Sequence, residues 1–382
     1  MLITKHLKLY HMKIFTNKAI LTVAVGVALL FTEQTTAQIT VPATSQEAEV
    51  TQRVGITDIT IHYNRPTKRG RAIWGGLVQY GFNDLGFGTS KSAPWRAGAD
   101  YNTTIEFTHD VKLEGKDVKA GKYALFMAPK EDGSVTIVLS SNTTSWGSFY
   151  YDEAEDVLRV EVQSKDVEQS RELLTYEFNT VTPTSATATL HWDKKEIPFK
   201  IDVAVTDIVM AGIENDLRNP KGFQQTTWDQ AAGYAFRAGN MEKALEWTNA
   251  SIEGNFFSKE NFANLSLKAQ ILMQRGNKAD AIKSFEKAAT HGANNEVFAL
   301  VRQLITANEK DVALTIAKNN LNKNKKDWIS NYALARAYSA KGDFKKALKS
   351  MNIAFNAEAT PTRFKTRLNN EIEKLKKGED IN

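Results

Sequence analysis

Cysteine is absent from the 382 residues of this chain, and its absence excludes a small scaffold held together by disulfides. No thiolate is available to bind a metal, and histidine is scarce. Beyond residue 37 four histidines remain, none paired at the spacing of metal ligands: His62, His109, His191 and His291. His62 and His191 alternate with apolar neighbours, which favours structural histidines on strand faces. The sequence therefore predicts no metal site and no cofactor.

Motifs of nucleophilic catalysis are also missing. The chain has no Gly-x-Ser-x-Gly elbow, and GFGTSK at 86–91 lacks the glycine spacing and the following helix of a phosphate loop. A hydrolase would place a second carboxylate or a histidine beside its binding residues, and only Asp100 and Asp152 are candidates. We therefore assign no catalytic residue and favour a protein that is not an enzyme.

Long hydrophobic runs are absent apart from one near the amino end. The apolar run at 19–31 has 13 residues, short of the roughly 20 that cross a bilayer as a helix. Lys13 and Lys18 precede it, and Thr35 and Ala37 supply the small residues of a cleavage site. We expect residues 1–37 to be a secretory signal peptide, 38–51 to be flexible, and the mature protein to be periplasmic or secreted with no transmembrane segment. An uncleaved anchor is the alternative.

A strong excess of one charge is missing as well, which argues against a nucleic-acid partner. Residues 38–205 carry 18 basic and 23 acidic side chains, whereas residues 206–382 carry 27 and 20. This change of sign indicates two domains and allows an electrostatic contact between them.

The first domain, 52–205, has apolar residues at every second position, which predicts half-buried strands. Turn signals separate the candidates, and no helical pattern interrupts them, so we expect an antiparallel β-sandwich, with a barrel as the alternative. The eight predicted strands are 59–63, 103–108, 123–128, 134–140, 157–162, 173–178, 186–192 and 198–203.

The second domain, 227–382, follows a linker at 206–226 and repeats itself. The stretches AGNMEKAL, RGNKADAI, ANEKDVAL and KGDFKKAL align. The seventh residue of each is an alanine: Ala244, Ala281, Ala313 and Ala347. A period of about 34 residues is typical of a helical solenoid, and these stretches resemble the tetratricopeptide repeat over residues 227–360. The third unit departs from the pattern at Val301 and Asn308, which leaves its curvature open. Residues 361–377 predict a capping helix.

Arginines and aromatic residues gather in irregular segments of the first domain. Such residues bind carboxylates, phosphates or sugar rings, and they can equally fasten long loops to a sandwich. The candidate ligand-binding residues are Arg65, Arg71, Trp95, Arg96, Asp100, Trp146 and Tyr150.

The same segments carry a family resemblance. YNRPTKRGRAIWGGLVQYG, WRAGAD before NTTIEF, KAGKYALFM, WGSFYYD with DVLRVEV, and LTYEF before ATLHW resemble the domain of unknown function 2911 over residues 56–203. The resemblance implies an exported bacterial β-rich domain, sometimes followed by tetratricopeptide-like helices, without an established activity. Asp100 stands where the family motif more often has Asn. The family's polar motif positions fall here on Arg65, Gly70, Arg71, Trp95, Arg96, Gly98, Trp146 and Gly147.

Two functions remain open at this point. The favoured one is a non-catalytic interaction module whose helical repeats hold a protein or peptide partner. The alternative is a receptor or enzyme for a small anionic or sugar-like ligand at the arginine and tryptophan cluster.

Overall fold

The computed structural model describes residues 42–254, 256–323 and 325–382. The predicted signal peptide and its cleavage site lie outside these residues. Among the helices that are described, none is long and apolar enough to span a membrane.

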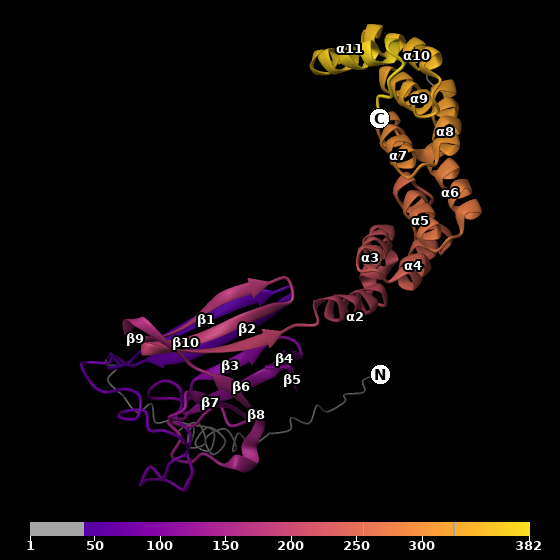
Figure 1. Cartoon of the computed structure of the whole chain (residues 1–382). Helices are drawn as coiled ribbons and strands as arrows, with labels where there is room; N and C mark the ends of the chain where they lie inside the picture. The colour runs from indigo at the N-terminus through magenta and orange to yellow at the C-terminus, as the bar shows by residue number, and fades with distance from the viewer. Residues whose placement is uncertain (1–41, 255, 324) are drawn as a thin grey trace, which may run out of the picture.

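Residues 46–202 form two antiparallel sheets that face each other across a shared core (Figure 1). Neither sheet closes on itself within the described residues, so the sandwich is confirmed and the barrel alternative is wrong. The first sheet has the order β1-β2-β3-β6-β7-β8: β1 (Gln46–Val54), β2 (Thr57–Arg65), β3 (Thr104–Phe107), β6 (Gly121–Pro129), β7 (Ser134–Ser140) and β8 (Asp156–Gln163). The second has the order β5-β4-β10-β9: β4 (Val111–Leu113), β5 (Lys116–Val118), β9 (Lys165–Thr182) and β10 (Ser185–Asp202).

Alternating residues of the strands fill the space between the sheets, as the pleat of a strand requires. Ile59 and Ile61 of β2 are fully buried, and so are Leu190 and Trp192 of β10, which reach the same core from the other sheet. The period-2 pattern of the sequence therefore located the inward face of these strands correctly.

Three differences between the predicted and the observed strands have a clear physical reason. Residues 46–51, expected within a flexible segment, belong to β1, whose polar residues on both faces conceal its alternation. The short strands β4 and β5 flank a turn in which Glu114 has a positive φ of 48°, and each is too short to show a period. The two segments predicted at 186–192 and 198–203 are one bent strand, β10.

Two long loops, residues 66–103 and 141–155, lie at the end of the sandwich away from the helices (Figure 1). Phe82 of the first loop and Tyr151 of the second pack on Ala124, Phe126 and Val138, which point outward from β6 and β7. The loops therefore bury the outer face of these strands, which explains why β6 is apolar at consecutive positions.

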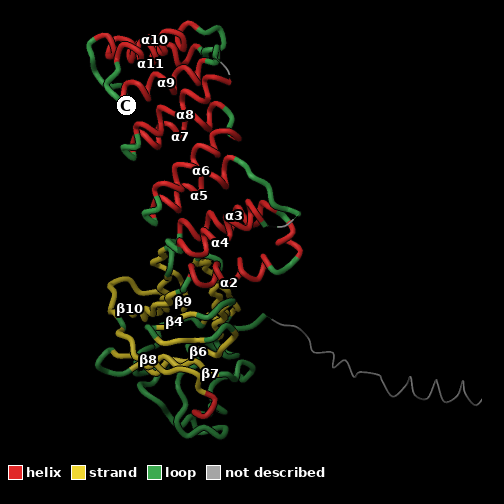
Figure 2. The backbone as a smooth tube through the Cα atoms, turned by 90° about the vertical axis from the view of Figure 1, so that its right-hand side faces the viewer, coloured by secondary structure: helices red, strands yellow, loops and turns green. Residues whose placement is uncertain are grey.

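The helical half is a stack of antiparallel pairs that ends in one more helix (Figure 2). The small residues at the predicted contact positions, Ala244, Ala281, Ala313 and Ala347, are fully buried, and the tetratricopeptide-like fold is confirmed. The pairs are α3 (Gln225–Arg237) with α4 (Met241–Glu253), α5 (Phe262–Gln274) with α6 (Lys278–His291), α7 (Asn294–Thr306) with α8 (Lys310–Lys323), and α9 (Trp328–Ala340) with α10 (Phe344–Asn356), followed by α11 (Thr362–Lys376).

Each pair turns through a residue in the left-handed conformation. Gly239, Gly276 and Gly342 have φ of 81°, 79° and 78°, and Asn308 takes the same place in the third pair with φ of 61°. The backbone N–H of Asn308 donates to the Ile305 carbonyl oxygen at 3.0 Å, the bond that Gly239 makes to Phe236 at 3.1 Å. The third unit thus keeps the turn of the others despite its departure from the repeat pattern.

Helix α2 (Val205–Leu217) occupies the first part of the expected linker and contacts both halves. Val205 and Ile208 pack against the sandwich core, whereas Met210 and Ile213 pack with α3 and α4. Gly55, between β1 and β2, has φ of 60°, and a Cβ there would lie 2.5 Å from the Val205 side chain. The sequence allowed a linker helix or a hinge, and the contacts of α2 on both sides favour the linker helix.

Candidate functional site

Tryptophans anchor the long loop 66–103 on the end of the sandwich. Trp95 stacks on Trp192 with ring centroids 6.0 Å apart and meets Trp74 edge to face at 5.9 Å. The backbone of Trp95 also exchanges hydrogen bonds of 2.9 Å with Met127 of β6. This loop is therefore an ordered part of the β-domain and can position side chains for binding.

Beside these tryptophans lies a cleft of about 520 Å³, within the size range of small-molecule sites. We call it the arginine cleft because Arg69, Arg71 and Arg96 line it. One carboxylate of the lining, Asp84, forms an ion pair of 3.2 Å with Lys91. The cleft consequently carries an excess of positive charge next to aromatic surface.

Arg96 is the most buried of these three cations. Its guanidinium lies 5.4 Å from the centroid of the Trp146 ring, and among the described residues no carboxylate approaches it within the 4.0 Å of an ion pair. Burial lowers the pKa of Arg96, and the charge of Asp100 offsets this only in part. Because arginine stays protonated at neutral pH, Arg96 is a partly desolvated cation that lacks a carboxylate within ion-pair distance among the described residues.

The structure brings three of the seven candidate residues into the arginine cleft: Arg71, Trp95 and Arg96. Arg65 instead donates to the Leu174 carbonyl oxygen at 3.0 Å and to Thr175 Oγ1 at 2.8 Å, which fastens β2 to β9. Asp100 adopts a φ of 57°, and its carbonyl oxygen accepts from the Gly147 N–H at 2.9 Å. Arg65 thus has a structural part, and Asp100 shapes the turn next to the cleft.

Trp146 and Tyr150 lie on the second loop, outside the lining of the cleft. Each is about half exposed, at 52%. Trp146 stacks on Phe149 at 5.8 Å, and Tyr150 meets Phe87 at 6.1 Å, so aromatic contacts tie the two loops together. Phe149 reaches the cleft itself, and Trp146 contributes to it through Arg96.

Sequence reasoning missed several lining residues. Arg69, Gln79 and Asn83 all line the cleft, and none is among the candidates, although Arg69 and Gln79 lie within the stretch YNRPTKRGRAIWGGLVQYG. Arg69 has a φ of 51°, and its backbone N–H donates to Glu172 at 2.7 Å. Such placement depends on contacts between distant segments, and no local pattern signals it.

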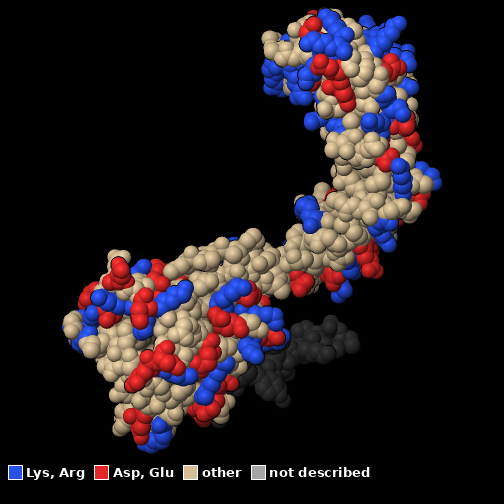
Figure 3. Space-filling view, in the orientation of Figure 1, with Lys and Arg blue, Asp and Glu red and all other residues tan. Residues whose placement is uncertain are grey.

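The helical half carries a second candidate surface, on the inner side of its arc, where α3, α5 and α7 lie (Figure 1). Two adjoining depressions of about 150 and 270 Å³ share Gln270 and Gln303 in their walls. We call them together the inner groove. Figure 3 shows few charged side chains on this side at α5 and α7, whereas Lys and Arg gather at the α10–α11 end.

Amide side chains distinguish the inner groove. Gln270, Gln274, Asn295 and Gln303 line it together with apolar residues such as Phe236. In the part of the chain that the structure describes, these four amides make no intramolecular side-chain hydrogen bond. Each therefore offers a free donor and a free acceptor.

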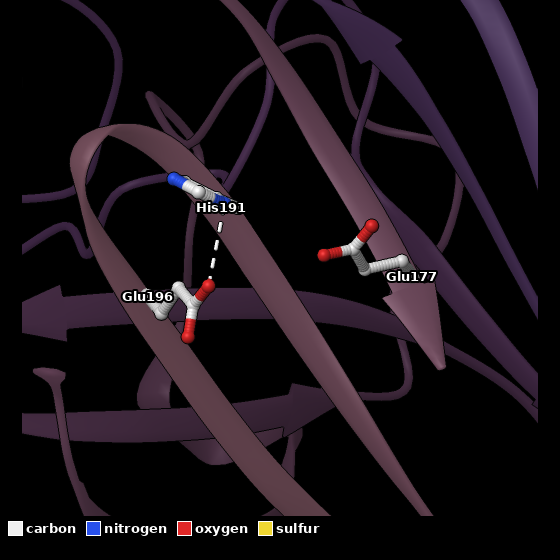
Figure 4. Close-up of side chains that lie close together, drawn as sticks. All are labelled: Glu177, His191 and Glu196. Carbon is white, nitrogen blue, oxygen red and sulfur yellow. Dashed lines mark ion pairs between the residues drawn. The ribbon is translucent and has the colours of Figure 1, made fainter. Parts of the chain in front are cut away.

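A third grouping lies outside the residues that line the arginine cleft. Glu177 of β9 and His191 and Glu196 of β10 place one ligand atom each within 4.8 Å of the others (Figure 4). No pattern in the sequence indicates this grouping.

Comparison with protein families gives a match over the sandwich. Residues 45–201 match the family described as "Protein of unknown function (DUF2911)". The resemblance seen in the sequence is thereby confirmed, and the matched residues span the sheets and both long loops. No curated protein matches the chain.

Solved structures match the helical half. One is the C-terminal part of a TPR repeat-containing protein from Cytophaga hutchinsonii, with 13% identity over 45% of this chain and 70% of that one, and a TM-score of 0.33. YrrB, described as a TPR protein with an unusual peptide-binding site, has 13% identity over 43% of this chain and 84% of its own, with a TM-score of 0.29. A tetratricopeptide repeat protein from Parabacteroides merdae has 14% identity over 46% of this chain and 74% of its own, with a TM-score of 0.29.

Proposed function

We propose that this protein is an exported, non-catalytic interaction protein whose helical array binds a peptide or a protein segment in the inner groove. The observation that carries the proposal is the row of amide side chains without intramolecular partners along α5 and α7. An extended peptide presents unpaired N–H and C=O groups along its backbone, and side-chain amides complement both.

The apolar residues of the inner groove supply the rest of the recognition. Phe236 and Met273 lie in the same depression as Gln270 and Gln303, where an apolar side chain of the partner would be shielded from water. Because few charges lie nearby, the favoured partner is an uncharged, extended segment.

The experiment is selection of binders from a displayed library of random peptides on the full mature chain. We expect the selected peptides to lose at least about tenfold in affinity for a Gln270→Ala/Gln303→Ala double variant, since each lost hydrogen bond contributes about 1 kcal/mol. The matched control is Asn319→Ala, an exposed amide on α8 of the outer row. Equal affinity for the double variant and the control would refute binding in the inner groove.

A second candidate function is binding of a small anionic ligand in the arginine cleft. The specific observation in its favour is the Arg96 cation, partly desolvated and without a carboxylate partner among the described residues. A carboxylate or phosphate would form charge-assisted hydrogen bonds with it, and Trp95 beside it offers an aromatic surface to the body of the ligand.

Thermal unfolding with inorganic phosphate, citrate and galacturonate tests this second function. A bound anion raises the melting temperature by mass action. The rise is expected to disappear in Arg96→Gln and to persist in Arg275→Gln, an exposed arginine at the end of α5. Absence of any rise with the wild type argues against the cleft and leaves the helical proposal untouched.

Export forms part of the proposal and rests on the apolar run at 19–31 with its flanking residues. Intact-mass measurement of the protein from a bacterial periplasm should give a chain beginning at Gln38. A chain that retains residues 1–37 would support an uncleaved anchor instead.

A further inference from the structure

The bend of β10 brings together His191 and Glu196, which are five residues apart in one strand. In a straight strand they would lie on opposite faces, separated by about 17 Å. Here the pairing of β10 with β9 shifts register on both sides of Asp193, which has a positive φ of 51°. Figure 4 shows the strand turning between the two side chains, so that both lie on one side of it.

His191 is buried, with 4% of its surface exposed. Among the described residues neither ring nitrogen has a hydrogen-bond partner, although Nδ1 lies 3.4 Å from Glu196 Oε1. A buried polar group without a partner costs about 1–3 kcal/mol, and such groups are rare in folded proteins. The orphaned imidazole therefore points to a ligand between the three side chains.

Glu177 completes the group from the neighbouring strand. Both of its carboxylate oxygens accept hydrogen bonds of 3.0 Å from Arg171, which fixes the orientation of the carboxylate. Each oxygen keeps a further lone pair, so Arg171 can hold Glu177 in place while it binds an ion. The carboxylates of Glu177 and Glu196 outnumber the guanidinium of Arg171, so the surroundings of His191 carry a net negative charge.

The donor set selects the kind of ion. One imidazole nitrogen with two carboxylate oxygens suits Zn²⁺, whereas Mg²⁺ and Ca²⁺ prefer oxygen ligands alone. Ligand atoms around tetrahedral zinc lie about 3.3 Å apart for bonds of about 2.0–2.1 Å. Since the three atoms are already within 4.8 Å, small side-chain rotations are sufficient.

We propose that Glu177, His191 and Glu196 bind a divalent transition-metal ion, Zn²⁺ by preference, which clamps the bent β9–β10 hairpin. Zinc would give the buried imidazole its missing partner. The ion would also join both sides of the bend in β10 to β9. A water molecule would occupy the fourth coordination position of the zinc ion.

The test uses the full mature chain, stripped with a chelator and titrated with ZnCl₂ by calorimetry and by thermal unfolding. We expect one ion per chain and a higher melting temperature with Zn²⁺, and no such rise with MgCl₂. Glu196→Gln preserves the size of a partly exposed side chain, so it should fold and should weaken zinc binding by at least roughly 100-fold.

A matched control exists in the other sheet, where His62 and Glu47 form a two-residue pair at 2.7 Å. His62→Gln should leave zinc binding unchanged. His191→Phe provides a second variant: it removes the orphaned nitrogens, should remain folded without metal, and should lose the zinc effect altogether. Zinc affinity that is unaltered in Glu196→Gln, or a rise with Mg²⁺ equal to that with Zn²⁺, would overturn the proposal.

Discussion

The β-domain and the helical array bury their apolar residues in different ways. The sandwich has one large core, to which residues from Val54 to Val203 contribute. The array instead has a series of smaller cores along the chain, three of which extend from Ala231 to Ile271, from Ala269 to Ala337, and from Tyr332 to Ile381. One half therefore depends on contacts between distant segments, whereas the other depends on neighbours.

This difference also governs where each half can place a site. The lining of the arginine cleft comes from loop 66–103, from β10 and from Phe149 of the second loop. Its geometry therefore exists only when the whole sandwich is folded. The inner groove needs only the four helices α3, α5, α6 and α7. We expect damage to spread through the β-domain and to stay local in the array, as in other solenoids.

The largest effect is expected from Trp192→Ala. This side chain is 1% exposed in the shared core and supports Trp95 at the cleft. Loss of a buried aromatic ring costs about 3–5 kcal/mol, so the melting temperature of the β-domain should fall while the array is unaffected. Calorimetry of the full chain, with hydrogen exchange to assign the transitions, measures both halves in one sample.

Phe285→Ala is the counterpart in the array, because Phe285 is also nearly fully buried, at 3%. Its hydrogen-exchange effect should remain within α5–α8 and leave α10 and α11 protected. If exchange rises equally over all helices, the array unfolds as one unit and the contrast with the sandwich disappears.

The sequence predicted what depends on local order. The alternation at Ile59 and Ile61, and the alanines from Ala244 to Ala347, placed the inward faces correctly because a strand or a repeat imposes its own period. Trp95 and Arg96, selected because an arginine stands beside a tryptophan in an irregular segment, line the arginine cleft, and their part in binding stays a prediction.

The missed features depend on contacts between distant segments. Arg65 was proposed as a ligand-binding residue, but it bonds to β9 more than 100 positions away. The grouping of Glu177 with His191 and Glu196 needs two register shifts in one hairpin, which follow from packing. A bend of this kind produces no periodic pattern in the sequence.

A buried ion pair lies at the end of the array. Arg336 is 5% exposed, and its Nη1 lies 3.4 Å from Glu371 Oε1, which also accepts from the Tyr332 hydroxyl at 2.9 Å. Glu371→Ala leaves the Arg336 charge buried without its counter-ion, which should cost about 3 kcal/mol. Urea unfolding followed by hydrogen exchange should show the loss confined to α9–α11.

Glu373→Ala serves as the control for this pair. Glu373 binds Lys376 at 2.8 Å, and both side chains are about half exposed. Removal of such a surface pair should change the free energy of unfolding by less than about 0.5 kcal/mol. Similar costs for the two substitutions would show that the Arg336–Glu371 pair is not desolvated.

The smallest predicted effect tests how independent the repeats are. Asn308 adopts the left-handed turn that Gly276 adopts in the preceding pair, and a Cβ at Gly276 would have open space within 4 Å. The two positions therefore differ only in the backbone strain that a residue with a Cβ has at positive φ. Asn308→Gly should stabilise the array by about 0.5 kcal/mol, and Gly276→Asn should destabilise it by a similar amount. Urea midpoints measure both, and a gain at 308 that also protects the β-domain would contradict the separation of the two halves.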